Sequence, residues 1–276
     1  MAQEFDFNCD NETQPIGVDV EDISTLKSPY IPIERHNFLF TEYHVNKWKQ
    51  KDITVIICQK VNIELIRLSL ESLLRFYPDV QIIIATHYTD KESLLYINDM
   101  VGKYRNITTV DYKVEVSVNS HGVLIDYVVR NYLKTKYFLC LDSDVIIERS
   151  GFIEEMLSEF KNDESLYGLG ALVYSWYNSD RPRTEIDNVP YVHPHCAMFN
   201  KQIYLSMNNS FQAGGDPFME NMKEAKDKNI KVRCFNVDRY MLHLEGGSWQ
   251  EHKKWSNVYK GMMRFTENEG VNTLKK

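Results

Sequence analysis

The segment Tyr137-Phe138-Leu139-Cys140-Leu141-Asp142-Ser143-Asp144 decides how the rest of the chain is interpreted. Five apolar or aromatic residues in a row predict a strand that is buried on both faces, as strands of parallel sheets are. Two acids, two positions apart, follow it at once. The segment therefore predicts a strand that delivers two carboxylates to one edge of a sheet. Because Asp-x-Asp is common in proteins, a turn carrying solvated acids is the alternative.

The residues before this segment alternate between strand and helix patterns. Apolar runs rich in β-branched residues predict strands at 53–58, 80–85, 107–116 and 137–141. Apolar residues at helical spacing predict helices at 65–76, 91–104 and 124–132. This alternation predicts an α/β fold with a mostly parallel central sheet and helices on both faces. Ligands of such sheets bind beyond the carboxyl ends of the strands, which is where Asp142 and Asp144 fall.

The rest of the chain is less regular. It predicts helices at 151–160 and 217–229 and strands at 166–174 and 231–237. Residues 175–195, rich in Tyr, Trp, Asn, Asp, Pro and His, predict an irregular binding segment. We expect three parts: a partly flexible N-terminal arm (1–50), the main domain (51–250) and a C-terminal tail or lid (251–276).

Composition excludes several classes of protein. A net charge of -7 argues against a nucleic-acid binder, which usually carries a basic face. The first 25 residues are acidic, and the apolar runs are strand-sized, so neither a signal peptide nor a transmembrane segment is expected. Cys58 and Cys140 lie in apolar runs and are expected to be buried thiols. A cytoplasmic location fits, with peripheral membrane association as the alternative.

The two aspartates predict a divalent metal site. Carboxylate oxygens suit Mg²⁺ or Mn²⁺, which usually bind one or two carboxylates together with substrate phosphates.

The order of these patterns resembles the GT-A-fold glycosyltransferases, and most of all the inverting family 2. The resemblance rests on the segments Thr54-Val55-Ile56-Ile57-Cys58, Glu71-Ser72-Leu73-Leu74, Ile82-Ile83-Ile84-Ala85, His121-Gly122, Arg130-Asn131 and the Asp-x-Asp strand end. It implies a Rossmann-like GT-A fold, a nucleotide-diphosphate sugar donor, a divalent metal, and transfer to a hydroxyl of a glycan, lipid or protein acceptor. Family members usually carry an acid after the second strand, where this chain has Thr86-His87.

The resemblance also suggests roles for residues late in the chain. It implies that His243 completes the metal site with Asp142 and Asp144, although a core histidine before a turn is the alternative. Gly246 and Gly247 would let backbone amides approach the diphosphate closely.

A catalytic base is expected near the start of a late helix. Asp216, which precedes Pro217, is the first candidate, and Glu220 competes with it. Asp216 could instead serve only as a helix N-cap, since a proline at the first helical position is favoured.

Nucleotide contacts are expected at Lys60, His87, His121 and Gly122, and at Asp142 near the ribose. A surface lysine, a loop histidine and packing at a helix start are the respective alternatives for Lys60, His87 and the His121-Gly122 pair.

An acceptor pocket could include the aromatic and histidine side chains of the irregular segment, namely Trp176, Tyr177, Tyr191, His193 and His195. His193-Pro194-His195 also suggests a metal, but no cysteine or third histidine lies nearby in the sequence, which argues against zinc.

Two other classes of function share these features. A retaining GT-A transferase or a sugar-phosphate nucleotidyltransferase would use similar metal ligands, but Gln59-Lys60-Val61-Asn62 lacks the glycines of a nucleotidyltransferase loop. A catalytically inactive nucleotide-sugar-binding module is the non-enzymatic alternative, and the presence of both aspartates and His243 argues against it.

Overall fold

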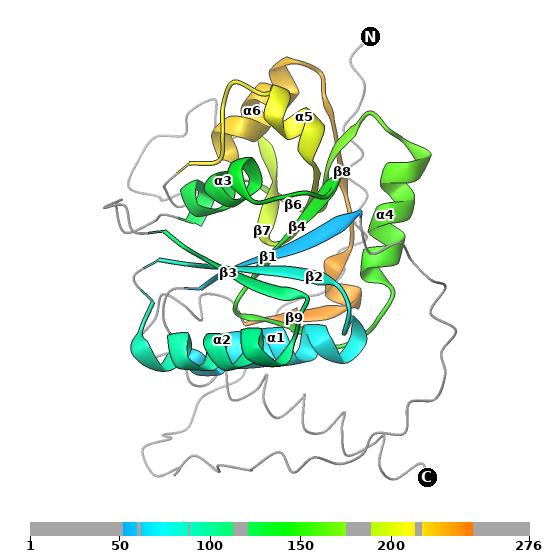
Figure 1. Cartoon of the computed structure of the whole chain (residues 1–276). Helices are drawn as coiled ribbons and strands as arrows, with labels where there is room; N and C mark the ends of the chain where they lie inside the picture. The colour runs from blue at the N-terminus through cyan, green and yellow to red at the C-terminus, as the bar shows by residue number, and fades with distance from the viewer. Residues whose placement is uncertain are drawn as a thin grey trace, which may run out of the picture. The chain divides into compact units, whose positions relative to one another are not determined.

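The computed structural model describes residues 52–59, 62–87, 89–112, 121–174, 189–212 and 217–244. A seven-stranded sheet forms its centre (Figure 1). In spatial order its strands are β3 (Ile107–Asp111), β2 (Gln81–Thr86), β1 (Ile53–Gln59), β4 (Tyr137–Asp142), β7 (Pro190–Asn200), β6 (Leu166–Tyr174) and β8 (Lys231–Cys234).

The sheet reverses its strand order next to β1. Strands β1, β2, β3 and β4 are parallel, and β6 is parallel to β8, whereas β7 is antiparallel to both β4 and β6. The chain moves from β1 outward to β3 and then returns to the opposite side of β1 with β4. The register pairs Cys58 with Asp142 at the carboxyl ends of β1 and β4. Asp142 therefore lies at the switch point of the sheet, where α/β folds bind ligands.

Helices cover both faces of the sheet. Helices α1 (Ile63–Phe76) and α2 (Lys91–Lys103) lie on one face, and α3 (His121–Asn131), α5 (Lys201–Ser206) and α6 (Met219–Asp227) lie on the other (Figure 1). Helix α4 (Phe152–Asn162) packs the ring of Phe160 against Tyr137, at 5.0 Å between centroids. The next residue of β4, Phe138, points the opposite way and stacks on Phe199. Consecutive residues of β4 thus bury both faces, as its unbroken apolar run predicts.

A second sheet has two short antiparallel strands, β5 (Val145–Ile147) and β9 (Met241–His243), and β9 follows the 3-10 turn Val237–Arg239. Strand β5 begins directly after Asp144. This small sheet therefore joins the middle of the chain to residues almost a hundred positions later.

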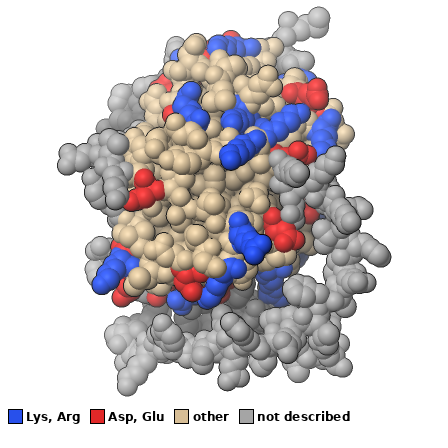
Figure 2. All heavy atoms as spheres, viewed as in Figure 1, with Lys and Arg blue, Asp and Glu red and all other residues tan. Residues whose placement is uncertain are grey.

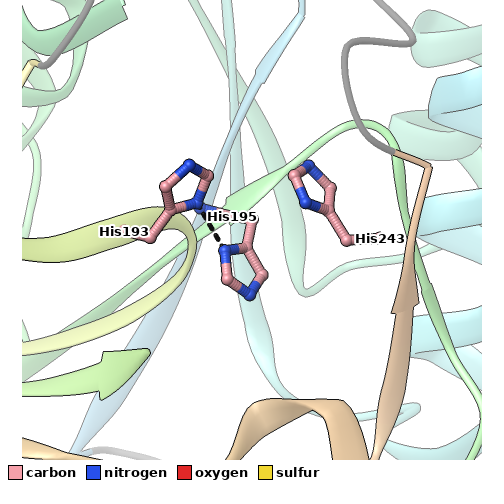
Figure 3. Close-up of side chains that lie close together, drawn as sticks. All are labelled: His193, His195 and His243. Atoms are coloured by element: carbon pink, nitrogen blue, oxygen red, sulfur yellow. Dashed lines mark hydrogen bonds between the residues drawn. The ribbon is translucent and has the colours of Figure 1, made fainter. Parts of the chain in front are cut away.

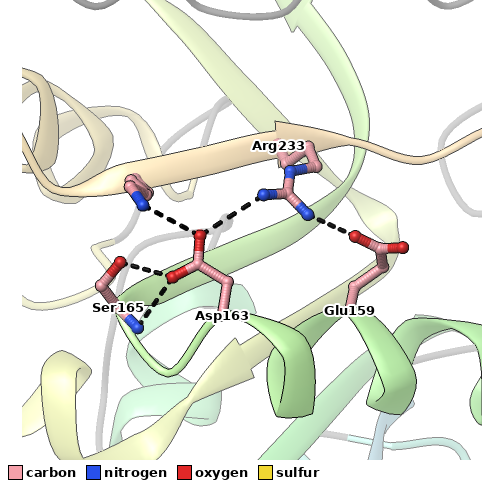
Figure 4. A network of polar contacts seen from close by, with 5 residues as sticks. Glu159, Asp163, Ser165 and Arg233 are labelled. Atoms are coloured by element: carbon pink, nitrogen blue, oxygen red, sulfur yellow. Dashed lines mark hydrogen bonds and ion pairs between the residues drawn. The ribbon is translucent and has the colours of Figure 1, made fainter.

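The outer edge of the main sheet is tied to α4 by charged side chains (Figure 4). Arg233 of β8 bonds Glu159 and Asp163, and Lys231 lies 3.0 Å from the Asp163 carboxylate. Ser165 also donates to Asp163, through its hydroxyl at 2.6 Å and its amide at 3.1 Å. On the face seen in Figure 2, basic and acidic side chains lie among one another with broad uncharged areas between them.

The structure confirms the α/β class, the mostly parallel sheet and the helices on both faces. Two predictions were wrong. Residues 175–195 were expected to be irregular, but strand β7 begins at Pro190, while 175–188 lie outside the described residues. The strand expected at 107–116 ends at Asp111. Strands β5 and β9 and helix α5 were not predicted. The arm 1–50 and the tail 251–276 lie outside the described residues, and no helix among those described is long and apolar enough to cross a bilayer.

Candidate functional site

Asp142 and Asp144 lie at the carboxyl end of β4, as the sequence predicts. Asp142 ends the strand and keeps 19% of its side chain exposed. Asp144 sits in the turn that follows and is 6% exposed. The turn matters because residues two apart along a straight strand point the same way, whereas a turn allows them to reach one point from two directions.

Two buried serines of α1 hold this turn. The Ser69 hydroxyl donates to the carbonyl oxygen of Asp142 at 3.3 Å. The Ser72 hydroxyl donates to the Ser69 carbonyl at 2.9 Å and accepts from the Ile147 amide of β5 at 2.9 Å. Sequence reasoning missed both residues. Their signal was a pair of serines three positions apart on the apolar face of a helix, where polar groups need partners.

His243 reaches the aspartates through the small sheet. It pairs with Val145 in the β5–β9 register, and the next amide, from Leu244, donates to the carbonyl of Asp144 at 2.9 Å. Its Nε2 lies 3.4 Å from Oδ1 of Asp144. Ligand atoms of Asp142, Asp144 and His243 all lie within 4.8 Å of one another. Two carboxylates and one imidazole that converge in this way fit a divalent cation of the Mn²⁺ or Mg²⁺ type.

The electrostatics of the site also favour a cation. Burial raises the pKa of Asp142, and the charge of Asp144 raises it further, while His121 and His243 lower it. His121 begins α3 and places its Nε2 3.5 Å from Oδ1 of Asp142. Two carboxylates held this close repel one another, and positive charge between them offsets the repulsion.

Gly122, next to His121, is required for close packing. A Cβ at this position would lie 2.2 Å from the carbonyl oxygen of Gln212 and 2.9 Å from Cβ of Pro217. The amide of Gln212 also donates to the carbonyl of Pro217 at 3.0 Å. Packing at the helix start therefore accounts for this glycine. Gln212 and Pro217, which bracket residues 213–216, lie against the start of α3.

The other predicted residues are placed as follows. His87 is 4% exposed, and its Nδ1 bonds the carbonyl of Tyr112 at 2.8 Å, so it links the ends of β2 and β3. Glu220 is exposed in the first turn of α6. Six predicted residues lie outside the described residues: Lys60, Trp176, Tyr177, Asp216, Gly246 and Gly247.

A cluster of three histidines adjoins the aspartates (Figure 3). His193 and His195 come from β7 and face one another, and the ring of His243 stacks on that of His195 at 4.7 Å between centroids. His195 is 6% exposed; burial, with His243 and His193 nearby, holds the pKa of His195 well below its usual value. Its imidazole is therefore neutral. The sequence could not show that His243 is the third histidine, because 48 positions separate it from His195.

Comparison with known proteins shows similarity in structure only. No protein-family model matches the chain, and no curated protein matches it. The mannosyltransferase PcManGT from Pyrobaculum calidifontis, solved with GDP-Man and Mn²⁺, superimposes with a TM-score of 0.52 at 13% identity, over 66% of this chain and 54% of that one. S. aureus TarS 1-349 gives 0.50 at 12% identity, over 79% and 65%.

A third similar structure is GalNAc-T7 with UDP, GalNAc and Mn²⁺, with a TM-score of 0.52 at 8% identity, over 66% of this chain and 41% of that one. This chain thus spans less than two thirds of the length of each of the three proteins. The similarities show that the chain has the GT-A fold.

Proposed function

We propose that this chain is a metal-dependent glycosyltransferase that moves a sugar from a nucleotide-diphosphate donor to an acceptor hydroxyl. The observation that carries the proposal is the convergence of Asp142, Asp144 and His243 within 4.8 Å at the switch point of a GT-A sheet. Two similar structures, PcManGT with GDP-Man and GalNAc-T7 with UDP, were solved with Mn²⁺, which supports a nucleotide donor and a divalent cation.

The chain's own residues would divide the work at this site. Asp144 and His243 would hold the cation, with Asp142 as a further ligand that also reaches toward the ribose. Mn²⁺ or Mg²⁺, when bound there, supplies positive charge for the leaving diphosphate. That charge matters in a chain whose net charge is -7. His121, 3.5 Å from Asp142, would orient that carboxylate.

An inverting transfer also needs a base on the acceptor side. We propose Asp216, which would take the proton of the attacking hydroxyl. Gln212 and Pro217 stand on either side of residues 213–216 in the sequence. Both pack against Gly122, which follows His121 in α3. Asp216 directly precedes Pro217 in the sequence, which supports it over Glu220, the competing base, which is exposed on α6. We keep Lys60, Gly246 and Gly247 as proposed donor contacts.

The test compares the full chain with Asp144→Asn. Unfolding temperature is measured with UDP or GDP, each with and without Mn²⁺, and donor hydrolysis is followed in the same samples. We expect nucleotide to raise the unfolding temperature of the unaltered protein only with Mn²⁺, because a ligand stabilises the state that binds it. Asp144→Asn should lose both this rise and the hydrolysis.

Asp163→Asn is the matched control, since Asp163 lies in the α4–β8 network and not among the proposed ligands. It should keep the nucleotide-dependent rise. An Asp144→Asn protein with the same Mn²⁺-dependent rise and the same hydrolysis would refute the proposal. Proton NMR of the product's anomeric centre decides between inversion and retention.

A further inference from the structure

The three histidines meet because β7 leaves its regular register. Leu172 of β6 pairs with Val192, but Gly170 pairs with Ala197, so two steps along β6 correspond to five steps along β7. Residues 193–196 lie opposite the single residue 171 and form a bulge that contains Pro194, a residue that cannot donate to a sheet ladder. Bulges bend a strand and re-aim its side chains, and they are frequent beside active sites.

The bulge lies directly against the end of β4. Leu141 pairs with Cys196, and the two strands are antiparallel. Asp142, the next residue of β4, and His195, the preceding residue of β7, therefore leave this pair on the same side. The backbone is tight here, because a Cβ on Gly170 would lie 2.6 Å from the carbonyl oxygen of Cys196. The positions of His193 and His195 are therefore fixed by the backbones of β4 and β6.

The nitrogens of the three rings converge. Ligand atoms of His193, His195 and His243 lie within 4.8 Å of one another. Nδ1 of His193 faces Nδ1 of His195 at 2.5 Å (Figure 3). At this separation the two nitrogens share a proton, and the His193 nitrogen also accepts from the backbone amide of His195 at 3.4 Å. An ion that replaces this proton requires the rings to move apart, because two nitrogens bound to a tetrahedral Zn²⁺ lie about 3.3 Å from one another. Nε2 of His195, on the side of the ring away from this contact, is buried and makes no hydrogen bond within the described part of the chain (Figure 3).

We propose that His193, His195 and His243 bind a second type of divalent cation, of the borderline class represented by Zn²⁺. Imidazole suits Zn²⁺, Cu²⁺ and Ni²⁺, whereas carboxylates suit Mg²⁺, and three histidines with an open fourth position are an established kind of zinc site. His193 and His243 are partly exposed, which gives an ion a route of entry. The fold supplies, in His243, the third histidine that the sequence around His193-Pro194-His195 does not contain.

His243 belongs to both ligand sets. A neutral imidazole offers one lone pair, so it binds one ion at a time. A cation held by the three histidines therefore takes His243 away from Asp142 and Asp144. Only this competition rests on the proposed function, because the three-histidine site itself requires no sugar transfer.

The test uses Co²⁺, whose visible absorption reports imidazole ligands, on the full chain stripped with EDTA. We expect Co²⁺ to give absorption bands with the unaltered protein. His193→Asn and His195→Asn should each weaken the binding about tenfold or more and remove the bands, since even outer residues of metal sites contribute about 10- to 100-fold in affinity. Asp144→Asn should keep the bands.

His87→Asn is the matched histidine control, because His87 bonds Tyr112 and lies outside the cluster; it should bind Co²⁺ unchanged. Unfolding temperatures in EDTA show which variants fold. If the buried His195→Asn does not fold, the partly exposed His193 decides the outcome. Bands that survive in His193→Asn, or that vanish in Asp144→Asn alone, would overturn the proposal. The proposed function is tested by a different measurement, the nucleotide-dependent stabilisation with Mn²⁺. Its failure can therefore be told apart from failure of the three-histidine site.

Discussion

Replacing Gly122 by alanine tests whether the start of α3 holds the segment that contains the proposed base. The new Cβ would lie 2.2 Å from the oxygen and 2.7 Å from the nitrogen of Gln212, and 2.9 Å from Cβ of Pro217. Two of these three atoms belong to the backbone, so no side-chain rotation relieves the overlap. Gln212 and Pro217 must therefore move away from α3.

The magnitude follows from two opposing effects. Overpacking in a tight region costs about 1–3 kcal/mol, and the backbone overlap places this site near the upper end. Alanine is favoured over glycine within a helix by about 0.5–1 kcal/mol, which offsets part of the cost. We expect a net loss of about 1–2 kcal/mol in the free energy of unfolding, and a fall of about 2–8 °C in unfolding temperature.

The assay measures unfolding temperature and the turnover of donor and acceptor. Gly102→Ala is the matched control, because Gly102 is also helical and a Cβ there meets nothing within 4 Å. This control should be equally or more stable than the unaltered protein, with unchanged turnover. Gly122→Ala should lose turnover beyond its loss of stability, since Pro217, which it displaces, directly follows the proposed base Asp216 in the sequence. If both variants have the same stability and turnover, the packing argument fails.

Three further predictions concern hydrogen bonds. Ser72→Ala removes the acceptor of the buried Ile147 amide, so we expect a loss of about 1–3 kcal/mol in the free energy of unfolding and weaker Mn²⁺ binding. Urea unfolding and metal titration measure the two effects, and equal values for both proteins would contradict the role of Ser72. Tyr167→Phe leaves the side-chain oxygen of buried Asn221 without its donor, which should also cost about 1–3 kcal/mol; an unaffected urea midpoint would count against it. Hydrogen bonds from Ser165 and then Lys231 lower the pKa of Asp163 below its ordinary 3.8. The ionised Asp163 therefore contributes its full stabilisation of the folded state above pH 3.8, and this stabilisation is lost as the pH falls through the lower pKa of the folded state. The stability difference between the unaltered protein and Asp163→Asn should therefore shrink below about pH 4, and a constant difference from pH 7 to 3 would refute this.

The sequence predicted the first half of the fold well because its signals are local. Runs such as Ile53–Gln59 and Tyr137–Asp142 are buried on both faces, and the helices between them carry regular apolar spacing. The pair Asp142 and Asp144 could be placed at a sheet edge because the strand before them ends there. His243 was identified only through resemblance to a family, since nothing in its own neighbourhood indicates a partner.

The second half was harder for physical reasons. Pro190 and Pro194 argue against a central strand. Pro190 is tolerated as the first residue of β7, and Pro194 lies in the bulge at 193–196. Strands β5 and β9 have three residues each, too few to show a period. Their pairing joins residues 145–147 to 241–243, and contacts at such separation leave no local pattern.

The pairing of β5 with β9 has a consequence for local unfolding of the protein. Strands of three residues are natural first points of fraying, and β9 also lies at the end of the described chain. An ion bound by both Asp144 and His243 would fasten these strands together much as a cross-link does. Loss of the ion would then allow β9 to separate from β5 while the seven-stranded sheet stays folded. The contact that completes the site would therefore also stabilise the β5–β9 pair against local unfolding.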